Sequence, residues 1–199
     1  MDYNKWFEQE FPSIKLNPPG SILADTAHFL VTYIRKKKPR IILEMGSGVS
    51  TAMLGLEVQK YGGELISIEH EKEYIEYTLE ICRKANYLKP NVIHAPLVKS
   101  TYPNVKDFIC YEKSKIPAKS YDFIFIDGPP GFKKNHPGRR GTFYQIFELL
   151  SPASCVFLDD GNRKKEQEAM MEWMNIFGSQ LSASYHKFEK AGFEIQITK

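Results

Sequence analysis

The segment at residues 40–51, RIILEMGSGVST, constrains the fold of this chain more than any other. Its apolar part predicts a buried strand that ends in the carboxylate of Glu44. Gly46 and Gly48 then predict a tight turn, and the following Ser and Thr open a helix. Glycine lets a backbone pass close to a ligand where a side chain would collide. This order of elements is typical of a pocket for an adenosine-type cofactor at the carboxyl edge of a parallel sheet.

A dinucleotide-binding turn is the nearest alternative, and it would place a third glycine three residues after the second. Thr51 stands at that position. The carboxylate of Glu44 would also repel a pyrophosphate, whereas it suits a cationic ligand. S-adenosylmethionine (SAM) carries a sulfonium and an ammonium and has no phosphates. We therefore expect a SAM pocket, although a plain strand-to-helix turn can carry the same glycine pair. The cofactor-binding residues expected here are Glu44, Gly46, Ser47, Gly48 and Thr51.

A second acidic residue ends the short apolar strand expected at residues 64–69. Glu69 lies 21 residues after Gly48, close to the offset of about 20 residues at which an acid meets ribose hydroxyls in such folds. A carboxylate can accept hydrogen bonds from both hydroxyls of one ribose. The alternative is that Glu69 only favours the dipole of the next helix. We expect the ribose contact, with His70 beside it as a further cofactor-binding residue.

The composition is that of one soluble globular domain. The chain has 199 residues, of which 42% are hydrophobic and 26% charged, enough for a substantial core. Its net charge of +3 does not by itself indicate nucleic acid. Cys82, Cys110 and Cys155 lack metal-site spacing and are expected to be reduced, which predicts a cytoplasmic protein. We find no secretory signal pattern and no apolar run of about 20 residues, so no membrane span is expected.

Strand-like and helix-like patterns alternate along the chain. We expect residues 1–20 to form an N-terminal arm and residues 21–199 to form the SAM-binding domain. Residues 99–120 show no clear period. The expected strands are 40–45, 64–69, 92–98, 121–127, 154–158, 182–189 and 193–198, and the clearest helices are 71–86, 141–150 and 164–177.

This alternation predicts an α/β fold, a doubly wound and mostly parallel sheet with helices on both faces. The break at Ala191 and Gly192 is too short for a crossover between parallel strands. The last two strands must therefore be antiparallel neighbours, and we expect an antiparallel strand at one edge of the sheet.

The chain resembles the class I SAM-dependent methyltransferases over nearly its whole length. The segments that carry the resemblance are EMGSG at 44–48, IEH at 68–70, IDGPPG at 126–131 and LDDG at 158–161. The resemblance implies a Rossmann-like, seven-stranded sheet whose last strand is antiparallel.

Within that family, three segments are similar to small bacterial methyltransferases of surface glycans or secondary metabolites. They are HAPL at 94–97, DGPPG at 127–131 and LDDGNR at 158–163. A more distant similarity to glucuronoxylan 4-O-methyltransferases rests on IDGPPG followed by PGR at 137–139.

The resemblance also implies roles for individual residues. Glu44 would face the methionine end of SAM through its amino group or an ordered water, and Glu69 would hold the ribose hydroxyls. The backbone around Ala95 would approach the adenine. Asp127 would lie near the sulfonium and the incoming nucleophile.

Asp127, Asp159 and Asp160 end two strands that we expect to be neighbours. Methyl transfer to a hydroxyl requires alignment of the reactants and removal of a proton. Asp127, Asp160 or His136 is a candidate general base. Alternatively, the three aspartates hold a divalent metal such as Mg²⁺, as in some O-methyltransferases of this fold. A third interpretation is that Asp159 and Asp160 only cap the next helix.

The loop after Asp127 is basic, with the sequence FKKNHPGRR at residues 132–140. Arginine binds two oxygens of a carboxylate or phosphate at once. Arg139 and Arg140, with Arg163 from the neighbouring loop, are therefore candidate substrate-binding residues for an anionic acceptor such as a uronic acid. The alternative is a solvated basic loop.

Together these features predict a SAM-dependent O-methyltransferase that acts on a hydroxyl of a carbohydrate or small molecule. An NAD-dependent sugar oxidoreductase and a non-catalytic SAM-binding partner in a glycan-assembly complex are the alternatives. A nucleic-acid methyltransferase is disfavoured, because no Asn/Asp-Pro-Pro-aromatic motif follows the fourth strand. The sequence leaves open whether the chain forms a homo-oligomer.

Overall fold

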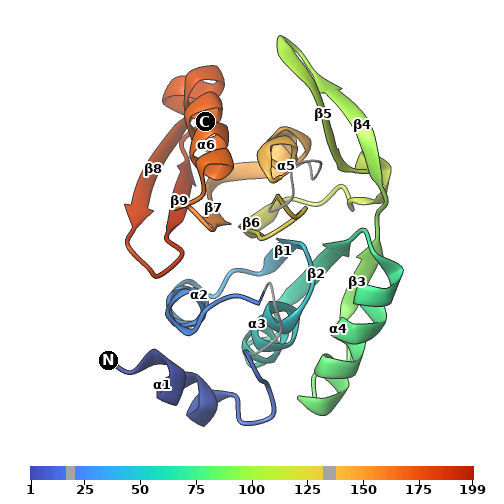
Figure 1. Ribbon diagram of the computed structural model, residues 1–199, viewed down its shortest axis with the longest axis vertical. Coiled ribbons are helices and arrows are strands. Elements are labelled where there is room, and N and C mark those ends of the chain that lie inside the picture. Colours follow the sequence, from blue (N-terminus) through green and yellow to red (C-terminus); the bar gives the residue numbers. More distant parts are fainter. Residues whose placement is uncertain (17–20, 132–137) are drawn as a thin grey trace.

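A seven-stranded sheet forms the centre of the molecule (Figure 1). The computed structural model describes residues 1–16, 21–131 and 138–199. The strands lie in the order β3-β2-β1-β6-β7-β9-β8. Their bounds are β1 (Ile41–Met45), β2 (Glu64–Glu69), β3 (Asn91–His94), β6 (Tyr121–Ile126), β7 (Leu150–Asp159), β8 (Leu181–His186) and β9 (Gly192–Ile197).

The antiparallel last strand is confirmed, but it lies inside the sheet rather than at its edge. β9 pairs antiparallel with both β7 and β8, whereas the other neighbours are parallel. Residues 182–185 of β8 are all exposed, as suits an edge strand, whereas β9 buries Ile195 and Ile197. The short link at residues 187–191 makes the two strands neighbours and does not decide which of them is outermost.

Helices cover both faces of the sheet, as predicted for a doubly wound fold (Figure 1). α2, α3 and α4 lie on one face, with α1 outside α2, and α5 and α6 lie on the other. The bounds are α1 (Tyr3–Glu10), α2 (Ala24–Lys37), α3 (Val49–Gln59), α4 (Lys72–Lys84), α5 (Arg140–Ile146) and α6 (Lys164–Phe177), with short 3₁₀ turns at Lys113–Lys115, Phe147–Leu149 and Gly178–Gln180.

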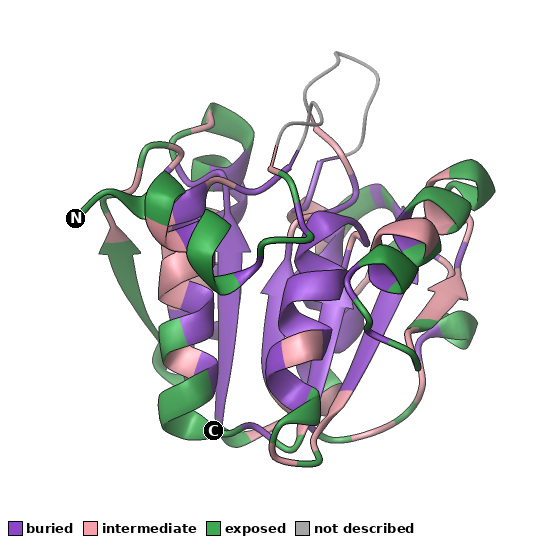
Figure 2. Ribbon diagram, turned by 90° about the horizontal axis from the view of Figure 1, so that it is seen from below, coloured by how far each residue is buried: buried purple, intermediate pink, exposed green. Residues whose placement is uncertain are grey.

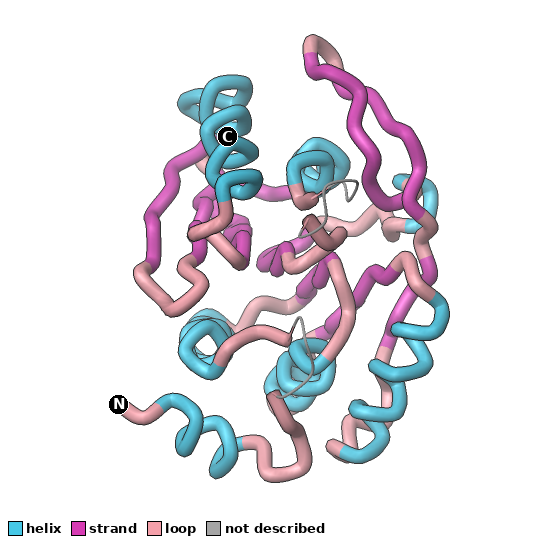
Figure 3. The backbone as a smooth tube through the Cα atoms, in the orientation of Figure 1, coloured by secondary structure: helices cyan, strands magenta, loops and turns pink. Residues whose placement is uncertain are grey.

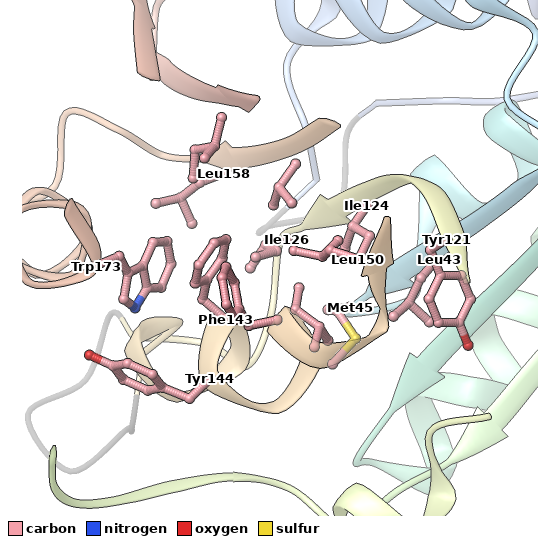
Figure 4. Close-up of a cluster of buried hydrophobic side chains, with 14 of the residues drawn as sticks. Leu43, Met45, Tyr121, Ile124, Ile126, Phe143, Tyr144, Leu150, Leu158 and Trp173 are labelled. Carbon is pink, nitrogen blue, oxygen red and sulfur yellow. The ribbon is translucent and has the colours of Figure 1, made fainter. Parts of the chain in front are cut away.

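Two buried clusters follow from the two-residue period of the strands. Leu43 and Met45 point to the α5 and α6 face, where they join a cluster that includes Trp173 (Figure 4). Ile42 points to the opposite face, under α2 and α3. The inner strands between these layers are buried, whereas the edge strand β8 and the outer sides of most helices are exposed (Figure 2). Glu44 therefore shares the face of Ile42, which decides where its carboxylate lies.

A β-hairpin outside the main sheet was not predicted. β4 (Leu97–Tyr102) and β5 (Val105–Tyr111) pair antiparallel and project away from the sheet (Figures 1 and 3). The strand expected at 92–98 is wrong in its second half, because β3 ends at His94 and Pro96 separates it from β4. Its apolar alternation is interrupted, because Ile109 is exposed and the register shifts between Ser100 and Tyr102.

The N-terminal residues that the structure describes pack against the domain. Phe7, Phe11 and Ile14 are buried in the same cluster as the apolar residues of α2 and α3. Among the described residues, no helix is long and apolar enough to cross a membrane.

Candidate functional site

The carboxyl ends of five strands meet at one edge of the sheet. Met45 pairs with both Ile68 and Ile126, and Glu69 pairs with His94. Backbone hydrogen bonds extend this alignment past the strands, since Gly46 N donates to Ile68 O at 2.9 Å and Asp127 N donates to Met45 O at 2.9 Å. The residues singled out in four separate motifs of the sequence therefore lie side by side.

The turns after β1 and β6 touch through glycine. Gly46 has φ +100°, and a Cβ placed on it would lie 2.8 Å from the backbone nitrogen of Gly128. A Cβ on Gly128 would in turn collide with the hydroxyl of Tyr111. Both glycines are thus required by space, and Gly46 also by its backbone conformation. The surface that they form is bare backbone with a phenol at its side.

Glu44 lies beneath α3 instead of facing a ligand. It is completely buried, and its carboxylate accepts hydrogen bonds from Ser50 Oγ at 2.5 Å, Thr51 Oγ1 at 2.6 Å and Ser67 Oγ at 2.5 Å. Burial raises the pKa of Glu44 to about 7, against the effect of these hydroxyls. The predicted contact with the methionine end of SAM does not match this geometry, because strand alternation turns the side chain under the helix.

Thr51 links this buried carboxyl to the turn. Gly48 N donates to Thr51 Oγ1 at 2.9 Å, and Thr51 Oγ1 donates to Glu44. Gly48 precedes α3 and has no side chain to cap it, so Thr51 bonds back to the chain in the manner of a capping box. Glu44 and Thr51 therefore hold the turn in place, and the carboxylate of Glu44 does not face a ligand phosphate.

Glu69 is the acid that lies at the turn itself. Its Oε2 accepts from Ser47 N at 3.1 Å, and its Oε1 accepts from His70 N at 2.7 Å and Glu71 N at 3.0 Å. His70 Nδ1 lies 2.7 Å from Oε1. Oε2 also accepts from Ser47 Oγ, at 3.5 Å. A carboxylate has about four acceptor sites, two on each oxygen. The three backbone amides fix its orientation, Oε1 is fully engaged, and Oε2, whose second contact is long, retains capacity for a ligand.

Two further predicted contacts have restricted access. Ala95 is fully buried and its N–H donates to Glu69 O at 2.7 Å, so this backbone donor is already used within the sheet. The side chain of His70 is 16% exposed and its ring lies edge-on to Tyr111.

Asp127, Asp159 and Asp160 are brought together by β6 and β7. One carboxylate oxygen from each lies within 4.8 Å of the others. The guanidinium of Arg139 lies among them, with Nη2 at 2.5 Å from both Asp127 Oδ1 and Asp160 Oδ2 and Nη1 donating to Asp159 O at 2.6 Å. Arg139 is only 3% exposed.

The charges of this cluster are strongly coupled. Burial raises the pKa of Asp127 well above its usual range, and it raises the pKa of Asp159 to about 6, although Arg139 opposes both shifts. Burial alone would lower the pKa of Arg139, but the surrounding carboxylates hold it above its ordinary value. The arginine is therefore a permanent cation among buried acids.

Solved structures of known proteins share this architecture. No protein-family model matches the chain, and no curated protein matches it. Solved structures do. A methyltransferase from Podospora anserina with bound S-adenosylhomocysteine (SAH) superposes with TM-score 0.67 at 14% identity, covering 100% of this chain and 89% of that one. The Bacillus cereus O-methyltransferase in complex with SAH gives 0.65 at 17% identity, covering 100% and 91%.

A third structure, the O-methyltransferase TomG from Streptomyces achromogenes with SAM, gives TM-score 0.62 at 16% identity over 99% of this chain and 89% of that one. The chain has the SAM-dependent methyltransferase fold. The implied Rossmann-like sheet is thereby confirmed, while these identities leave the activity to be argued from the residues.

Within the methyltransferase fold, the three predicted substrate-binding arginines differ in availability. Arg139 is engaged by the aspartates. Arg140 turns the other way, with Nε 2.8 Å from Glu172 Oε2, and lines a groove of about 420 Å³ beside the hairpin. The side chain of Arg163 is 34% exposed, with Nη1 2.8 Å from Asp160 Oδ2. His136 lies outside the described residues, so its role remains a prediction.

Two residues of this edge were missed by the sequence analysis. Tyr111 ends β5, in the stretch without a clear period, and its buried hydroxyl has no hydrogen-bond partner among the described residues. Glu166, in the first turn of α6, is 1% exposed and neither of its carboxylate oxygens has such a partner. Only the hairpin and the packing of α6 bring these residues to the site, and no local pattern marks them.

Proposed function

We propose that this chain is a SAM-dependent O-methyltransferase that acts on a hydroxyl of a small molecule or carbohydrate. The observation that carries the proposal is the carboxylate of Glu69, which three backbone amides hold beside the Gly46 turn of a methyltransferase fold. An acid fixed in this position suits the two hydroxyls of a ribose. The solved relatives of this fold named above bind SAH or SAM.

The residues of the edge fit a SAM molecule. Glu69 retains acceptor capacity for the ribose, and the contact between Gly46 and Gly128 leaves a wall of backbone against which a ligand can lie closely. Tyr111 adds an unpaired phenol next to that wall. A buried hydroxyl without a partner costs about 1–3 kcal/mol, so packing holds this phenol behind the wall at a cost in stability.

Asp127 is the residue that we assign to the proton. Its Oδ1 is bonded to Arg139, while no described residue donates a hydrogen bond to Oδ2, and the side chain is 16% exposed. SAM supplies a methyl group on a positively charged sulfur. As the C–S bond breaks and the O–C bond forms, the hydroxyl proton passes to Asp127 Oδ2. The raised pKa of Asp127 makes this carboxylate a stronger base than a free aspartate.

Asp160 is a weaker candidate for the same step. Its Oδ2 is held by both Arg139 and Arg163. Its Oδ1 is buried, so neither oxygen is free to take a proton from an acceptor hydroxyl. We infer that Asp160 positions the arginines instead.

The partly exposed Arg163 gives the site an affinity for an anionic acceptor, such as a uronic acid or a phosphorylated sugar. We also place the enzyme in the cytoplasm, because its three cysteines are unpaired and buried.

The proposal is tested by calorimetry and by transfer of labelled methyl groups. The protein should bind SAH and not NAD, and Glu69→Gln should weaken SAH binding by at least about tenfold. Asp127→Asn should keep SAH binding and lose transfer to the accepted hydroxyl. Asp122→Asn is the matched control, since Asp122 lies at the other end of β6 and bonds only to backbone N–H groups there.

Binding of NAD in place of SAH would overturn the proposal in favour of an oxidoreductase. Tight SAH binding without transfer to any hydroxyl of an acceptor panel would indicate the non-catalytic partner instead.

A further inference from the structure

The acid cluster at the ends of β6 and β7 has the ligands of a metal site and a cation already in place. The three aspartates, whose carboxylate oxygens lie close together, offer the hard oxygen ligands that Mg²⁺ or Ca²⁺ prefers. Such ions lie about 2.0–2.6 Å from each ligand oxygen. Arg139 Nη2 lies 2.5 Å from two of these oxygens, one on Asp127 and one on Asp160. An ion held by both oxygens would therefore crowd or displace this nitrogen.

We propose that Arg139 is a built-in cation that takes the place of a divalent metal in this cluster. The geometry of Arg139 alone indicates that the metal is excluded. What this exclusion does for methyl transfer rests on the proposed function.

Arg139 is anchored well enough to keep this position. Its second nitrogen, Nη1, donates to the backbone carbonyl of Asp159 at 2.6 Å. The residue immediately precedes α5. The base of the loop before it is closed, because Gly138 N donates to Pro130 O at 3.2 Å and a Cβ on Gly131 would lie 3.0 Å from Gly138 Cα. Backbone on both sides thus fixes where the side chain starts, and three acceptors fix where it ends.

The charge of a divalent ion is also supplied by the chain. Arg163 Nη1 lies 2.8 Å from the same Asp160 oxygen that Arg139 contacts. The two guanidinium groups together carry the formal charge of Mg²⁺ and do not deprotonate in proteins. Glu166 adds a fourth buried carboxyl next to this group. Two guanidinium groups thus face four carboxyl groups and supply the charge that one divalent ion would bring.

This arrangement has a consequence for the acceptor. A metal in such a site would bind the acceptor oxygen directly and would favour acceptors with two adjacent oxygens as ligands. With arginine in its place, one hydroxyl within reach of Asp127 is sufficient, and the arginines only orient anionic groups.

Mn²⁺ is the probe that tests the proposal, with electron paramagnetic resonance of the purified full chain as the readout. The wild-type protein should bind no Mn²⁺ in the micromolar range. Arg139→Ala should bind one Mn²⁺ at least about tenfold more tightly than the wild type, and Asp160→Asn added to it should abolish this binding. Arg140→Ala is the matched control, since it removes the same charge one residue away and should bind Mn²⁺ no better than the wild type.

Stoichiometric Mn²⁺ binding by the wild type that Asp160→Asn abolishes would overturn the proposal, and this titration needs no Arg139 variant. A folded Arg139→Ala protein without Mn²⁺ binding would overturn it as well. If Arg139→Ala does not fold, Arg139→Gln, whose side chain is shorter and uncharged, should show the same gain. SAH calorimetry on each protein reports separately on the proposed function, and methyl transfer should persist in EDTA.

Discussion

Gly46→Ala should reveal how tightly the two turns of the site are packed, and Gly62→Ala provides the comparison. Both glycines have positive φ, +100° for Gly46 and +75° for Gly62. A Cβ at Gly62 would meet nothing within 4 Å, whereas a Cβ at Gly46 would lie 2.8 Å from Gly128 N and 3.0 Å from its Cα. The pair of variants therefore separates backbone strain from collision.

The magnitudes follow from these two contributions. The left-handed backbone costs alanine about 1–2 kcal/mol, and the stiffer unfolded chain returns about 0.4–1 kcal/mol, so Gly62→Ala should destabilise the protein by about 1 kcal/mol. At Gly46 the collision with backbone atoms adds an overpacking cost of about 1–3 kcal/mol. For a chain of 199 residues, 1 kcal/mol shifts Tm by about 2–4 °C. We expect losses of about 3 °C for Gly62→Ala and about 10 °C for Gly46→Ala.

Scanning calorimetry measures the two Tm values, and titration with SAH measures binding. Gly46→Ala should also weaken SAH binding by more than about tenfold, because the turn after β1 must move away from Gly128, while Gly62→Ala should leave it unchanged. Equal losses of Tm in the two variants, or unchanged SAH affinity in Gly46→Ala, would refute the inference that this contact shapes the site.

Three other predictions concern single groups of the site. Asp127→Asn should reduce methyl transfer by at least about 100-fold with little change in SAH binding, as measured by label transfer and calorimetry; an unchanged rate would remove Asp127 from the chemistry. Tyr111→Phe should raise the free energy of unfolding by about 1 kcal/mol, because it deletes a buried hydroxyl without a partner. Urea unfolding measures the change, and a loss of stability would show that the hydroxyl has a partner. Glu44 has a folded pKa of about 7, above that of the unfolded chain, so its contribution to stability is complete below pH 4.5 and is lost as pH rises through 7. Glu44→Gln should remove this pH dependence of the free energy of unfolding, which amounts to about 3 kcal/mol for a pKa raised from 4.5 to about 7. Urea unfolding at pH 5 and pH 8 should then give a smaller difference in stability than in the wild type. An equal difference would contradict the raised pKa.

The fold was largely predictable because the central strands are nearly continuous apolar runs in the sequence. The strands at 41–45, 64–69 and 121–126 agree with the expectation within a residue or two. The order of β8 and β9 was not predictable from their link, since only the burial of Ile195 and Ile197 distinguishes the inner strand from the edge strand. The hairpin at 97–111 was missed because its apolar residues do not alternate regularly, since Ile109 is exposed and the register shifts between Ser100 and Tyr102.

The site was predictable in its chain positions and less so in its contacts. Alternation along β1 places Glu44 on the face of Ile42, under α3, whereas the motif around it predicted a contact with the ligand. Arg139 was expected to meet a substrate, but its partners are aspartates from the ends of β6 and β7. Tertiary structure decides which acid an arginine meets, and sequence spacing does not.

The projecting hairpin ties one residue of the site to a remote loop. Tyr111 contacts Gly128 only because β5 keeps its register against β4, with Leu97 opposite Tyr111 and Tyr102 opposite Val105. Side chains reverse their direction at each step along a strand. Deleting a single residue between the hairpin tip and Cys110 would therefore turn the neighbouring side chain toward Gly128 and the phenol outward. A change far from every acid described here would then alter the packing beside the proposed SAM site.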